Sequence, residues 1–391
     1  KEHYNRLSAI AFAGEDNRLV TCDSRGRAIL WDLEKKKLIW SKRPHQSRLT
    51  DCHFSPDGNT IYLASTDRTI SSIDATTGEE ETASILKHPS GVSSMEVSPD
   101  GKRLVSVCSL ETDFLNPGSQ IIVWDLVSNK RLRNIDLKNY AVNDLHFTPS
   151  GESAIIVCND NTVRVLDLND SGSNELTMET ILDFEKLGGL VWSAKFTPDG
   201  NSILTVGGSE AKIWDAKNHR EELSFSPHGA VAAADFSADG KHSVTGSWDN
   251  SAKIWDIKSG QAVKKLIGGH SGYINSAVFS SDSQYILTGS DDMTAKLWSF
   301  ATGEVIQTYT GHAGPVLQAI FSPDGKTILT VSNDKRLESG TPKQGNKSAS
   351  HSSDMSGRSF VAHFHPTANG SLPVVRTTSL CFGTLRIAQS L

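Results

Sequence analysis

The chemically suggestive residues of this sequence are histidines, hydroxyl residues and aspartates that recur in a fixed order. In the most regular set, His270 precedes Asp292 by 22 residues and Thr288 precedes it by four. Histidine, a hydroxyl and a carboxylate are the groups of a nucleophilic hydrolase triad. A nucleophile site is normally built once, whereas this set recurs in several stretches of the chain. We therefore interpret the set as a structural hydrogen-bond network and predict that the protein is not an enzyme.

The recurrence extends to the whole chain, because an apolar anchor returns every 40 to 50 residues, usually before a turn of Ser/Thr-Pro-Asp-Gly type. The anchors are Phe12, Phe54, Val97, Phe147, Phe196, Phe236, Phe279 and Phe321. All but the last are followed by a pair of Trp-Asp type: Trp31-Asp32, Ile73-Asp74, Trp124-Asp125, Leu166-Asp167, Trp214-Asp215, Trp255-Asp256 and Trp298-Ser299. A fixed period with two anchors indicates one supersecondary module copied in series.

Each module has an all-β pattern. In the seventh module, short β-branched and aromatic runs separated by Gly, Asp and Ser predict strands at Ile274–Phe279, Tyr285–Gly289, Ala295–Trp298 and Glu304–Tyr309. No helical periodicity persists. Four strands in about forty residues are typical of one blade of a β-propeller.

Residues 1 to about 335 resemble WD repeats, whose blades carry Gly-His at the start and Trp-Asp at the end. The resemblance implies an all-β WD-repeat β-propeller of seven four-stranded blades plus an incomplete eighth that has only two strands, roughly Val316–Phe321 and Thr327–Val331. The alternative is an eight-bladed ring completed by strands of the tail. It also implies a buried tetrad of His, Ser/Thr, Asp and Trp in each regular blade. The complete sets are His228, Thr245, Asp249 and Trp255, and His270, Thr288, Asp292 and Trp298.

Other modules keep only part of the tetrad. The eighth has His312, Thr330 and Asp334, with Gly340 in the Trp position. In the first module Arg25 takes the Asp position, and in the second His45 and Asp67 accompany Leu63 and Ile73. Buried polar groups need partners, so complete tetrads are expected to stiffen their blades.

Composition is that of an ordinary globular protein: 391 residues, 37% hydrophobic and 21% charged. A net charge of −6 argues against a nucleic-acid or anionic-membrane binder, and no apolar run is long enough to span a membrane. The five cysteines, among them Cys22, Cys108 and Cys158, show neither disulfide nor zinc spacing. We expect no metal and no cofactor, and we expect a reducing compartment, the cytoplasm. Because the chain begins with Lys1, close to His3, we expect a fragment of a longer protein.

Residues 336–391 lose the blade period and are rich in Ser, Thr and Gly. They are either a disordered tail or the product of a single-base frameshift near Lys335, real or a sequencing error. Shifting the codons by one base places Trp at position 340 and a further His, Thr, Asp and Trp at positions 355, 373, 377 and 383, which is a ninth repeat. We favour the frameshift. The domain boundary is therefore predicted at residue 335, and motifs in the tail, including His351, His363 and His365, carry no function.

The functional surface is expected where the loop before the first strand and the turn before the third strand of each blade gather on one face. The predicted partner-binding residues there are Trp248, Arg48, Arg6, Tyr273 and Asp291, together with Phe114 and Leu115 in an insertion of the third module. Trp, Tyr and Arg dominate interface hot spots, and an exposed indole favours a partner that covers it. Alternatively, Trp248 folds back onto a neighbouring loop.

Two functions remain open. The resemblance implies a non-catalytic scaffold or regulatory platform that docks protein partners. The regular Ser-Pro-Asp-Gly turns look like the bacterial branch of the family, in which such arrays are often attached to another domain, for instance a Ser/Thr kinase. The alternative is a propeller enzyme or small-ligand binder that uses the central channel.

Overall fold

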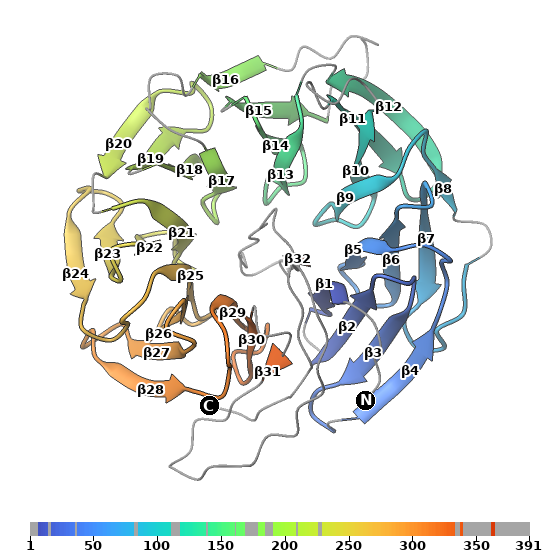
Figure 1. Ribbon diagram of the computed structural model, residues 1–391. Coiled ribbons are helices and arrows are strands. Elements are labelled where there is room, and N and C mark those ends of the chain that lie inside the picture. Colours follow the sequence, from blue (N-terminus) through green and yellow to red (C-terminus); the bar gives the residue numbers. More distant parts are fainter. Residues whose placement is uncertain are drawn as a thin grey trace. The chain divides into compact units, whose positions relative to one another are not determined.

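The computed structural model describes residues 7–14, 17–35, 37–81, 85–110, 118–137, 140–160, 162–168, 179–183, 191–208, 210–225, 229–332, 337–338 and 361–363. These residues contain β-strands and turns and no helix. The chain divides into two compact units, residues 1–196 with 361–376 and residues 197–360 with 377–391. Each module of the sequence corresponds to one group of consecutive strands (Figure 1).

Unit 1 contains four complete modules and the first strand of the fifth. Its strands are β1 (Leu7–Phe12), β2 (Arg18–Asp23), β3 (Ala28–Asp32), β4 (Lys37–Lys42), β5 (Leu49–Phe54), β6 (Thr60–Ser65), β7 (Thr69–Asp74), β8 (Leu86–Lys87), β9 (Val92–Val97), β10 (Arg103–Leu110), β11 (Gly118–Asp125), β12 (Lys130–Leu137), β13 (Val142–Phe147), β14 (Ser153–Cys158), β15 (Thr162–Asp167), β16 (Glu179–Asp183), β17 (Val191–Phe196) and β32 (Val361–His363). Within each module the strands pair antiparallel in chain order.

Unit 2 continues the series. Its strands are β18 (Ser202–Gly207), β19 (Glu210–Asp215), β20 (Glu221–Phe225), β21 (Val231–Phe236), β22 (His242–Ser247), β23 (Ala252–Asp256), β24 (Ala262–Leu266), β25 (Ile274–Phe279), β26 (Tyr285–Ser290), β27 (Ala295–Ser299), β28 (Val305–Tyr309), β29 (Val316–Phe321), β30 (Ile328–Ser332) and β31 (Leu337–Glu338). The four strands predicted for the seventh module are confirmed as β25 to β28, within one residue at each end.

The burial of each strand follows its place in the module. First strands such as β25 are buried at almost every position, whereas fourth strands such as β28 are largely exposed. A tight turn joins the first two strands. In the seventh module, Ser280 Oγ donates to Asp282 Oδ1 at 2.6 Å and accepts from the Tyr285 backbone N–H at 3.0 Å. This side-chain bonding explains why a hydroxyl residue and Asp return at each turn.

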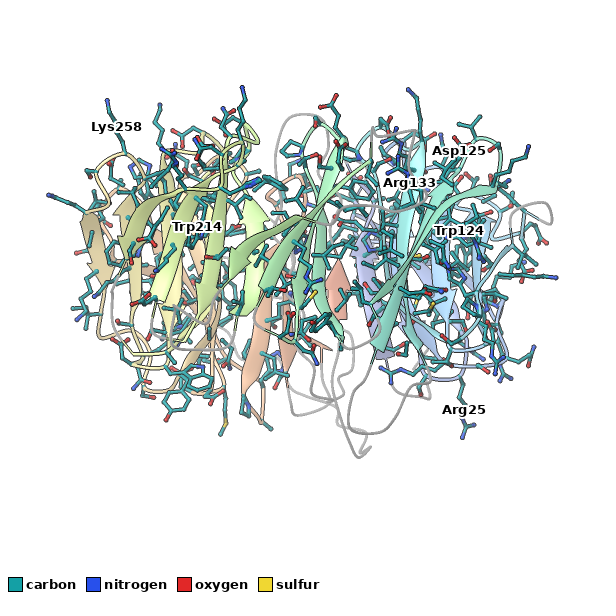
Figure 2. The ribbon with its side chains drawn as sticks, turned by 90° about the horizontal axis from the view of Figure 1, so that it is seen from above. Arg25, Trp124, Asp125, Arg133, Trp214 and Lys258 are labelled. Carbon is teal, nitrogen blue, oxygen red and sulfur yellow. The ribbon has the colours of Figure 1, made fainter. Side chains whose placement is uncertain are left out.

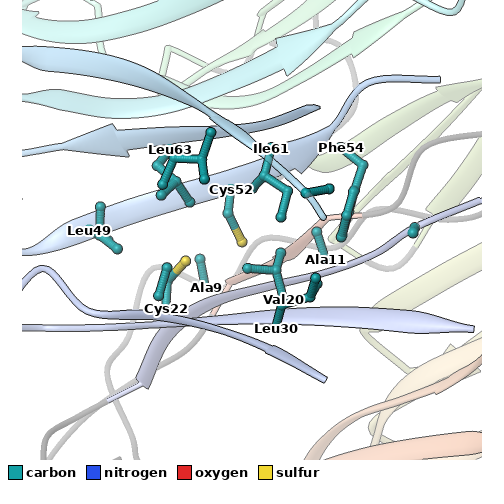
Figure 3. Close-up of a cluster of buried hydrophobic side chains, with 14 of the residues drawn as sticks. Ala9, Ala11, Val20, Cys22, Leu30, Leu49, Cys52, Phe54, Ile61 and Leu63 are labelled. Atoms are coloured by element: carbon teal, nitrogen blue, oxygen red, sulfur yellow. The ribbon is translucent and has the colours of Figure 1, made fainter. Parts of the chain in front are cut away.

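The core of the first two modules shows how neighbouring sheets pack. Ala9, Val20 and Leu30 of the first sheet meet Leu49 and Phe54 of the second in one buried cluster (Figure 3). Cys22 and Cys52 belong to the same cluster and are fully buried, free thiols. Burial, followed by the neighbouring Cys22 thiol, raises the pKa of the Cys52 thiol. The packing of apolar side chains between sheets holds successive modules together.

The two ends of each sheet carry different turns. In unit 1, Figure 2 shows Arg25 at the lower edge of the view and Asp125 at the upper edge. Arg25 lies in the turn between β2 and β3, and Asp125 ends β11, before the turn to β12. We call the end of each unit's sheets that carries the second-to-third-strand turns the entry end.

The fold class is confirmed as an all-β propeller type, with one correction in the eighth module. Two strands were expected there, but the sheet has three, in the order β29-β30-β31. The third is short and pairs Leu337 with Val331 and Glu338 with Thr330. Residues 361–363 form β32, which pairs in parallel with β1 at Ala9 to Ala11. The remaining residues of the predicted tail, apart from 337–338 and 361–363, lie outside the described residues.

Candidate functional site

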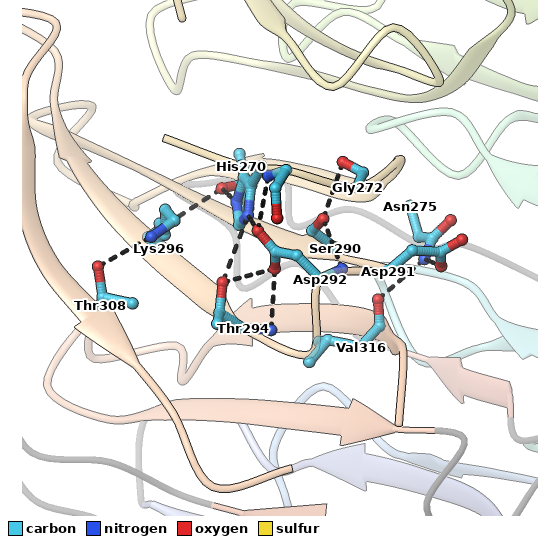
Figure 4. Close-up of polar contacts among 12 residues, drawn as sticks. His270, Gly272, Asn275, Ser290, Asp291, Asp292, Thr294, Lys296, Thr308 and Val316 are labelled. Carbon is cyan, nitrogen blue, oxygen red and sulfur yellow. Dashed lines mark hydrogen bonds and ion pairs between the residues drawn. The ribbon is translucent and has the colours of Figure 1, made fainter. Parts of the chain in front are cut away.

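The tetrad of the seventh module is a continuous chain of hydrogen bonds, and Figure 4 shows two of its members, His270 and Asp292. His270 Nδ1 lies 2.8 Å from Asp292 Oδ2, and His270 Nε2 lies 2.7 Å from Thr288 Oγ1. Trp298 Nε1–H donates to the same hydroxyl at 2.8 Å. The chain joins the loop before β25 to the two central strands of the sheet and to the turn between them.

The donors and acceptors fix the protonation of this network. Since Thr288 Oγ1 accepts the indole proton of Trp298, its own proton is free to be donated to His270 Nε2. The proton on Nδ1 is then donated to Asp292. Burial lowers the pKa of His270, although the Asp292 carboxylate opposes the shift, so the imidazole is neutral. The seventh tetrad is therefore a satisfied structural network rather than a poised nucleophile.

The glycine before the tetrad histidine has a packing role. A Cβ at Gly269 would come within 2.2 Å of the Trp298 ring. Only glycine lets the backbone pass so close to the indole. This contact explains the Gly-His pair that opens the module.

The sixth module has the same tryptophan-to-hydroxyl bond as the seventh and the same hydrogen bonds to its aspartate. Trp255 Nε1–H donates to Thr245 Oγ1 at 2.9 Å. Asp249 Oδ1 accepts from the Ser251 hydroxyl at 2.7 Å and from the Ser251 backbone N–H at 2.9 Å. His228 lies outside the described residues.

Tryptophan-to-hydroxyl bonds recur in three more modules. Trp31 donates to Thr21 at 2.8 Å, Trp124 to Ser106 at 3.0 Å and Trp214 to Thr205 at 2.9 Å. In the eighth module His312 Nε2 lies 2.9 Å from Thr330 Oγ1, while Asp334 lies outside the described residues. His3 also lies outside them, and Arg25 is exposed at the Asp position of the first module.

Two networks were missed from the sequence. In the third module His88 Nε2 lies 2.8 Å from Ser106 Oγ, the hydroxyl that also receives Trp124. The 18-residue separation of His88 and Ser106 equals that of His270 and Thr288, and it could have revealed the set. Burial lowers the pKa of His88 to about 4, so this imidazole is neutral as well.

The second module rebuilds its network with a different residue. His45 Nδ1 lies 2.7 Å from Asp67 Oδ2, and His45 Nε2 lies 2.8 Å from Ser71 Oγ. The sequence pattern placed Leu63 at the position of the tetrad hydroxyl, so the tetrad of the second module was predicted to be incomplete. Ser71 on β7 is the cross-strand partner of Leu63 on β6, so the hydroxyl comes from the neighbouring strand.

Side chains of the first strands join successive modules. Two positions in each first strand supply the acceptors. The side chain three residues before a module's anchor accepts from the backbone N–H two residues before the anchor of the next module. The side chain one residue before the anchor accepts from the backbone N–H of the next module's anchor. In unit 1, Met95 N–H donates to Asp51 at 2.9 Å and Phe147 N–H donates to Glu96 at 3.0 Å. In unit 2, Ala319 N–H donates to Ser276 at 2.9 Å and Phe279 N–H donates to Asp235 at 3.0 Å. We call these bonds the module stitches.

A buried ionic group lies among the stitches of unit 1. His146 Nε2 lies 3.1 Å from Asp144 Oδ2, and Ser193 Oγ donates to the same oxygen at 3.0 Å. Burial acts to lower the pKa of His146, but the carboxylates of Asp144 and Glu96 outweigh it and raise the pKa to about 9. His146 is therefore a cation held between two carboxylates.

The predicted partner-binding residues fall into two groups. Trp248 and Tyr273, both in unit 2, stack with ring centroids 5.7 Å apart and an interplanar angle of 20°. They remain 44% and 49% exposed, so Trp248 both folds onto the neighbouring loop and faces solvent. Asp291 lies in the turn beside them, where its N–H donates to the Tyr273 carbonyl at 2.9 Å.

The remaining predicted residues are not part of this group. Arg48, in unit 1, is half-buried, and burial lowers its pKa. Its Nε has no hydrogen-bond partner among the described residues. Arg6, Phe114 and Leu115 lie outside the described residues.

Among the residues that the structure describes, no three His, Cys, Asp or Glu side chains are grouped so that they could hold a metal ion. None of the described segments forms a helix that is long and apolar enough to cross a membrane. His351 and His365 lie outside the described range, as do the side-chain contacts of His363.

A family model matches five segments of the chain. The model for the WD domain, G-beta repeat, matches residues 36–74, 80–125, 220–256, 260–299 and 303–338, together just over half of the chain. The chain belongs to the WD-repeat family. Its modules are WD repeats, and each four-stranded sheet is a blade of a WD-repeat β-propeller.

Two curated relatives and one solved structure extend the comparison. The WD repeat-containing protein WDS homolog of Arabidopsis thaliana is 27% identical over 289 residues, which are 70% of this chain and 51% of the relative. The guanine nucleotide-binding protein subunit beta of Zea mays is 25% identical over 233 residues, 54% of this chain and 57% of the relative. The chain thus spans about half the length of these relatives. The computationally designed Ika8 protein, at 22% identity, has a TM-score of 0.66 over 86% of this chain and 96% of its own, which shows the fold alone.

Proposed function

We propose that this WD-repeat protein is a non-catalytic interaction scaffold that docks a protein partner at the entry end of blades six and seven. The observation that carries the proposal is the stacked and exposed pair of Trp248 and Tyr273. Large aromatic side chains left in water are costly, and they are the residues that most often supply binding energy at protein interfaces. WD-repeat relatives include a guanine nucleotide-binding protein subunit beta, a subunit of an assembly, which supports a protein partner.

The surrounding backbone holds the pair in place. Trp248 N–H donates to the Ala230 carbonyl at 2.9 Å, and Asp291 N–H donates to that of Tyr273 at 2.9 Å. Each bond ties a second-to-third-strand turn to the loop that enters its own blade. A rigid platform loses little conformational entropy when a partner binds.

The alternative function, an enzyme or a small-ligand binder in the central channel, would draw on polar side chains of the first strands. The carboxylates of Asp51, Glu96 and Asp235 there accept backbone N–H groups of the next blade. These carboxylates therefore have a structural role that already accounts for them. This structural role of the carboxylates supports the scaffold function over an enzyme or ligand site in the central channel.

Capture of the native partner from the source cell tests the proposal. Trp248→Ala should lower the amount of partner captured at least tenfold, the ratio that corresponds to about 1.4 kcal/mol, with no change in thermal stability. Asp239→Ala, in the turn between β21 and β22, is the matched control and should leave capture unchanged. Arg48→Glu tests the predicted residue of unit 1 separately. Undiminished capture by Trp248→Ala would remove the pair from the site.

We also propose a cytoplasmic location, an inference that rests on cysteine usage. Cys22 and Cys52 are neighbouring thiols that an oxidising compartment would tend to join. Thiol labelling of the protein taken from cells tests this proposal, and a native disulfide between them would contradict it.

The coding DNA with its flanks tests three further proposals: the frameshift near Lys335, a bacterial source, and a covalently attached domain such as a kinase. The last two rest on the Ser-Pro-Asp-Gly turns, and the plant relatives described above lend them no support. An unbroken reading frame for residues 336–391 in independent isolates would refute the frameshift.

A further inference from the structure

We propose that the docking site on blades six and seven recognises an arginine side chain of the protein partner, stacked on Trp248 and Tyr273 and paired with Asp291. This inference rests on the proposed function, because it names the chemistry of the partner for the same site. It arises from three features of unit 2: the stacked rings, the carboxylate of the turn that is bonded to the Tyr273 loop, and the fixed geometry of the turns.

The first feature is the exposed ring surface. Two rings that stack at 5.7 Å and 20° cover only the faces that they turn toward each other. The exposure of 44% for Trp248 and 49% for Tyr273 shows that much of each ring still faces solvent. The face of an aromatic ring carries negative potential and attracts a cation, with Trp the strongest of the three aromatic residues.

The second feature is the carboxylate of Asp291. Its Oδ1 accepts a hydrogen bond from Asn275 Nδ2 at 2.7 Å, and Asn275 is itself fixed by donating to the Val316 carbonyl at 3.0 Å (Figure 4). Oδ2 has no hydrogen-bond partner among the described residues. The Asp291 N–H is bonded to the Tyr273 carbonyl, so the turn that carries this carboxylate is tied to the loop that carries Tyr273. One acceptor oxygen is thus available in the turn that is bonded to the Tyr273 loop.

The third feature is the charge and rigidity of the neighbouring turn. Asp292 adds a second carboxylate, and its partner His270 is neutral, so the pair keeps a negative charge. The second-to-third-strand turns of blades six and seven have the same backbone form. Asn250 in the first and Met293 in the second both occupy the left-handed region, each with φ of 68°. Met293 is 45% exposed and extends the apolar surface beside Asp291 with a flexible thioether.

An arginine fits these features better than other side chains. Its planar guanidinium stacks on aromatic faces and at the same time presents several N–H donors to a carboxylate. A lysine ammonium is a strongly hydrated point charge and would gain less from the stacked rings. A neutral apolar side chain would cover the rings but would leave the Asp291 carboxylate desolvated without a counter-charge.

Three blocked tripeptides test the inference on the full chain: acetyl-Gly-Arg-Gly-amide, its lysine analogue and its citrulline analogue. Citrulline has nearly the shape of arginine but carries no charge. Binding is followed through the indole N–H signal of Trp248 in nuclear magnetic resonance spectra, assigned with the variant Trp248→Phe. The arginine peptide is expected to move this signal and to bind about five- to tenfold more tightly than the citrulline peptide, with lysine between them.

Two variants identify the role of the carboxylate. Asp291→Asn should reduce the affinity for the arginine peptide to that for the citrulline peptide, whereas Asp239→Asn should have no effect. Equal binding of arginine and citrulline, no movement of the Trp248 signal, or an unchanged affinity in Asp291→Asn would each overturn the inference. If Trp248→Ala still abolishes partner capture in those cases, the proposed docking function stands and only the arginine assignment fails. If capture is unaffected, the docking function itself fails.

Discussion

The second and seventh blades both hold a buried histidine between an aspartate and a hydroxyl, but they take the hydroxyl from different strands. In the seventh blade it is Thr288 on β26, which also receives the Trp298 indole. In the second it is Ser71 on β7, and Ile73 stands at the Trp position. The histidine-to-aspartate bond is nearly the same length in both, 2.7 Å and 2.8 Å.

The difference shows that the position of the tetrad hydroxyl depends on the tryptophan and not on the histidine. The link between the entry loop and the turn needs only the histidine, the aspartate and some hydroxyl within reach. The tryptophan needs a hydroxyl at one position on the second strand, because its indole N–H must find an acceptor when buried. Once the tryptophan is replaced by Ile73, the hydroxyl can move to the paired strand.

The largest expected effect is the loss of the indole. Trp298 is 1% exposed, so Trp298→Ala should lower the free energy of unfolding by about 3–5 kcal/mol through the cavity and the lost donor to Thr288. Ile73→Ala in the second blade should cost less, about 2–4 kcal/mol, since it removes fewer atoms and no hydrogen bond. Denaturant unfolding of both variants checks the order, and a larger loss for Ile73→Ala would contradict the role given to the indole.

The aspartates should come next. Asp292 accepts hydrogen bonds from His270, from the Ser271 N–H and from the N–H and hydroxyl of Thr294. Asp292→Ala should therefore cost about 3 kcal/mol, because it leaves these partly buried donors without their acceptor. Asp67→Ala should cost nearly as much.

Arg25→Ala is the matched control for the aspartate variants. Arg25 occupies the same position in the first blade but is exposed, so its loss should change stability by less than about 0.5 kcal/mol. Equal falls in melting temperature for Arg25→Ala and Asp292→Ala would show that the tetrad assignment is wrong.

The relocated hydroxyl gives a sharper test. Ser71→Ala should cost about 1–2 kcal/mol by leaving His45 Nε2 unpaired. Leu63→Thr should destabilise the wild-type protein but recover part of the loss in Ser71→Ala, since it returns a hydroxyl to the usual strand. A double-mutant cycle measures this coupling, and purely additive losses would mean that strand position, not the hydroxyl, decides the contact.

The smallest effects at neutral pH concern the histidines. The folded pKa of His88 is about 4, below the unfolded value near 6.5, so its contribution is present at neutral pH and is lost as the pH falls from about 6.5 towards 4. The pH dependence from His146 has the opposite sign. Its folded pKa of about 9 lies above the unfolded value, so its contribution to stability is present below about pH 6.5 and is lost as the pH rises towards 9. Between pH 6 and 7 each term changes by less than about 1 kcal/mol. Titration of the two imidazole signals by nuclear magnetic resonance checks both directions, and titration of either near 6.5 would contradict its assignment.

The repeat period, the strands and the module type could be predicted from the sequence, because anchors and turns are local signals that every copy repeats. It did not reveal Ser71, since a hydroxyl on the neighbouring strand becomes a partner only through the pairing of β6 with β7. The Trp248 and Tyr273 positions could be predicted at the entry end of the sheets from their place in the repeat. Their stacking could not be predicted, because ring orientation depends on how two blades pack and leaves no mark in the spacing of residues.

The module stitches bear on how such a chain can change by duplication. Each stitch pairs a side chain of one blade with the backbone of the next, as Asp51 does with Met95 and Glu96 with Phe147. Serine serves at one junction and a carboxylate at another, so the copies are not equivalent at their borders. The donor in each stitch is a backbone N–H, which every residue except proline carries, so a blade moved to another place would still find a donor in its new neighbour. The junctions therefore tolerate duplication and exchange of blades, and the side chains of the copies can diverge without loss of the bonds between them.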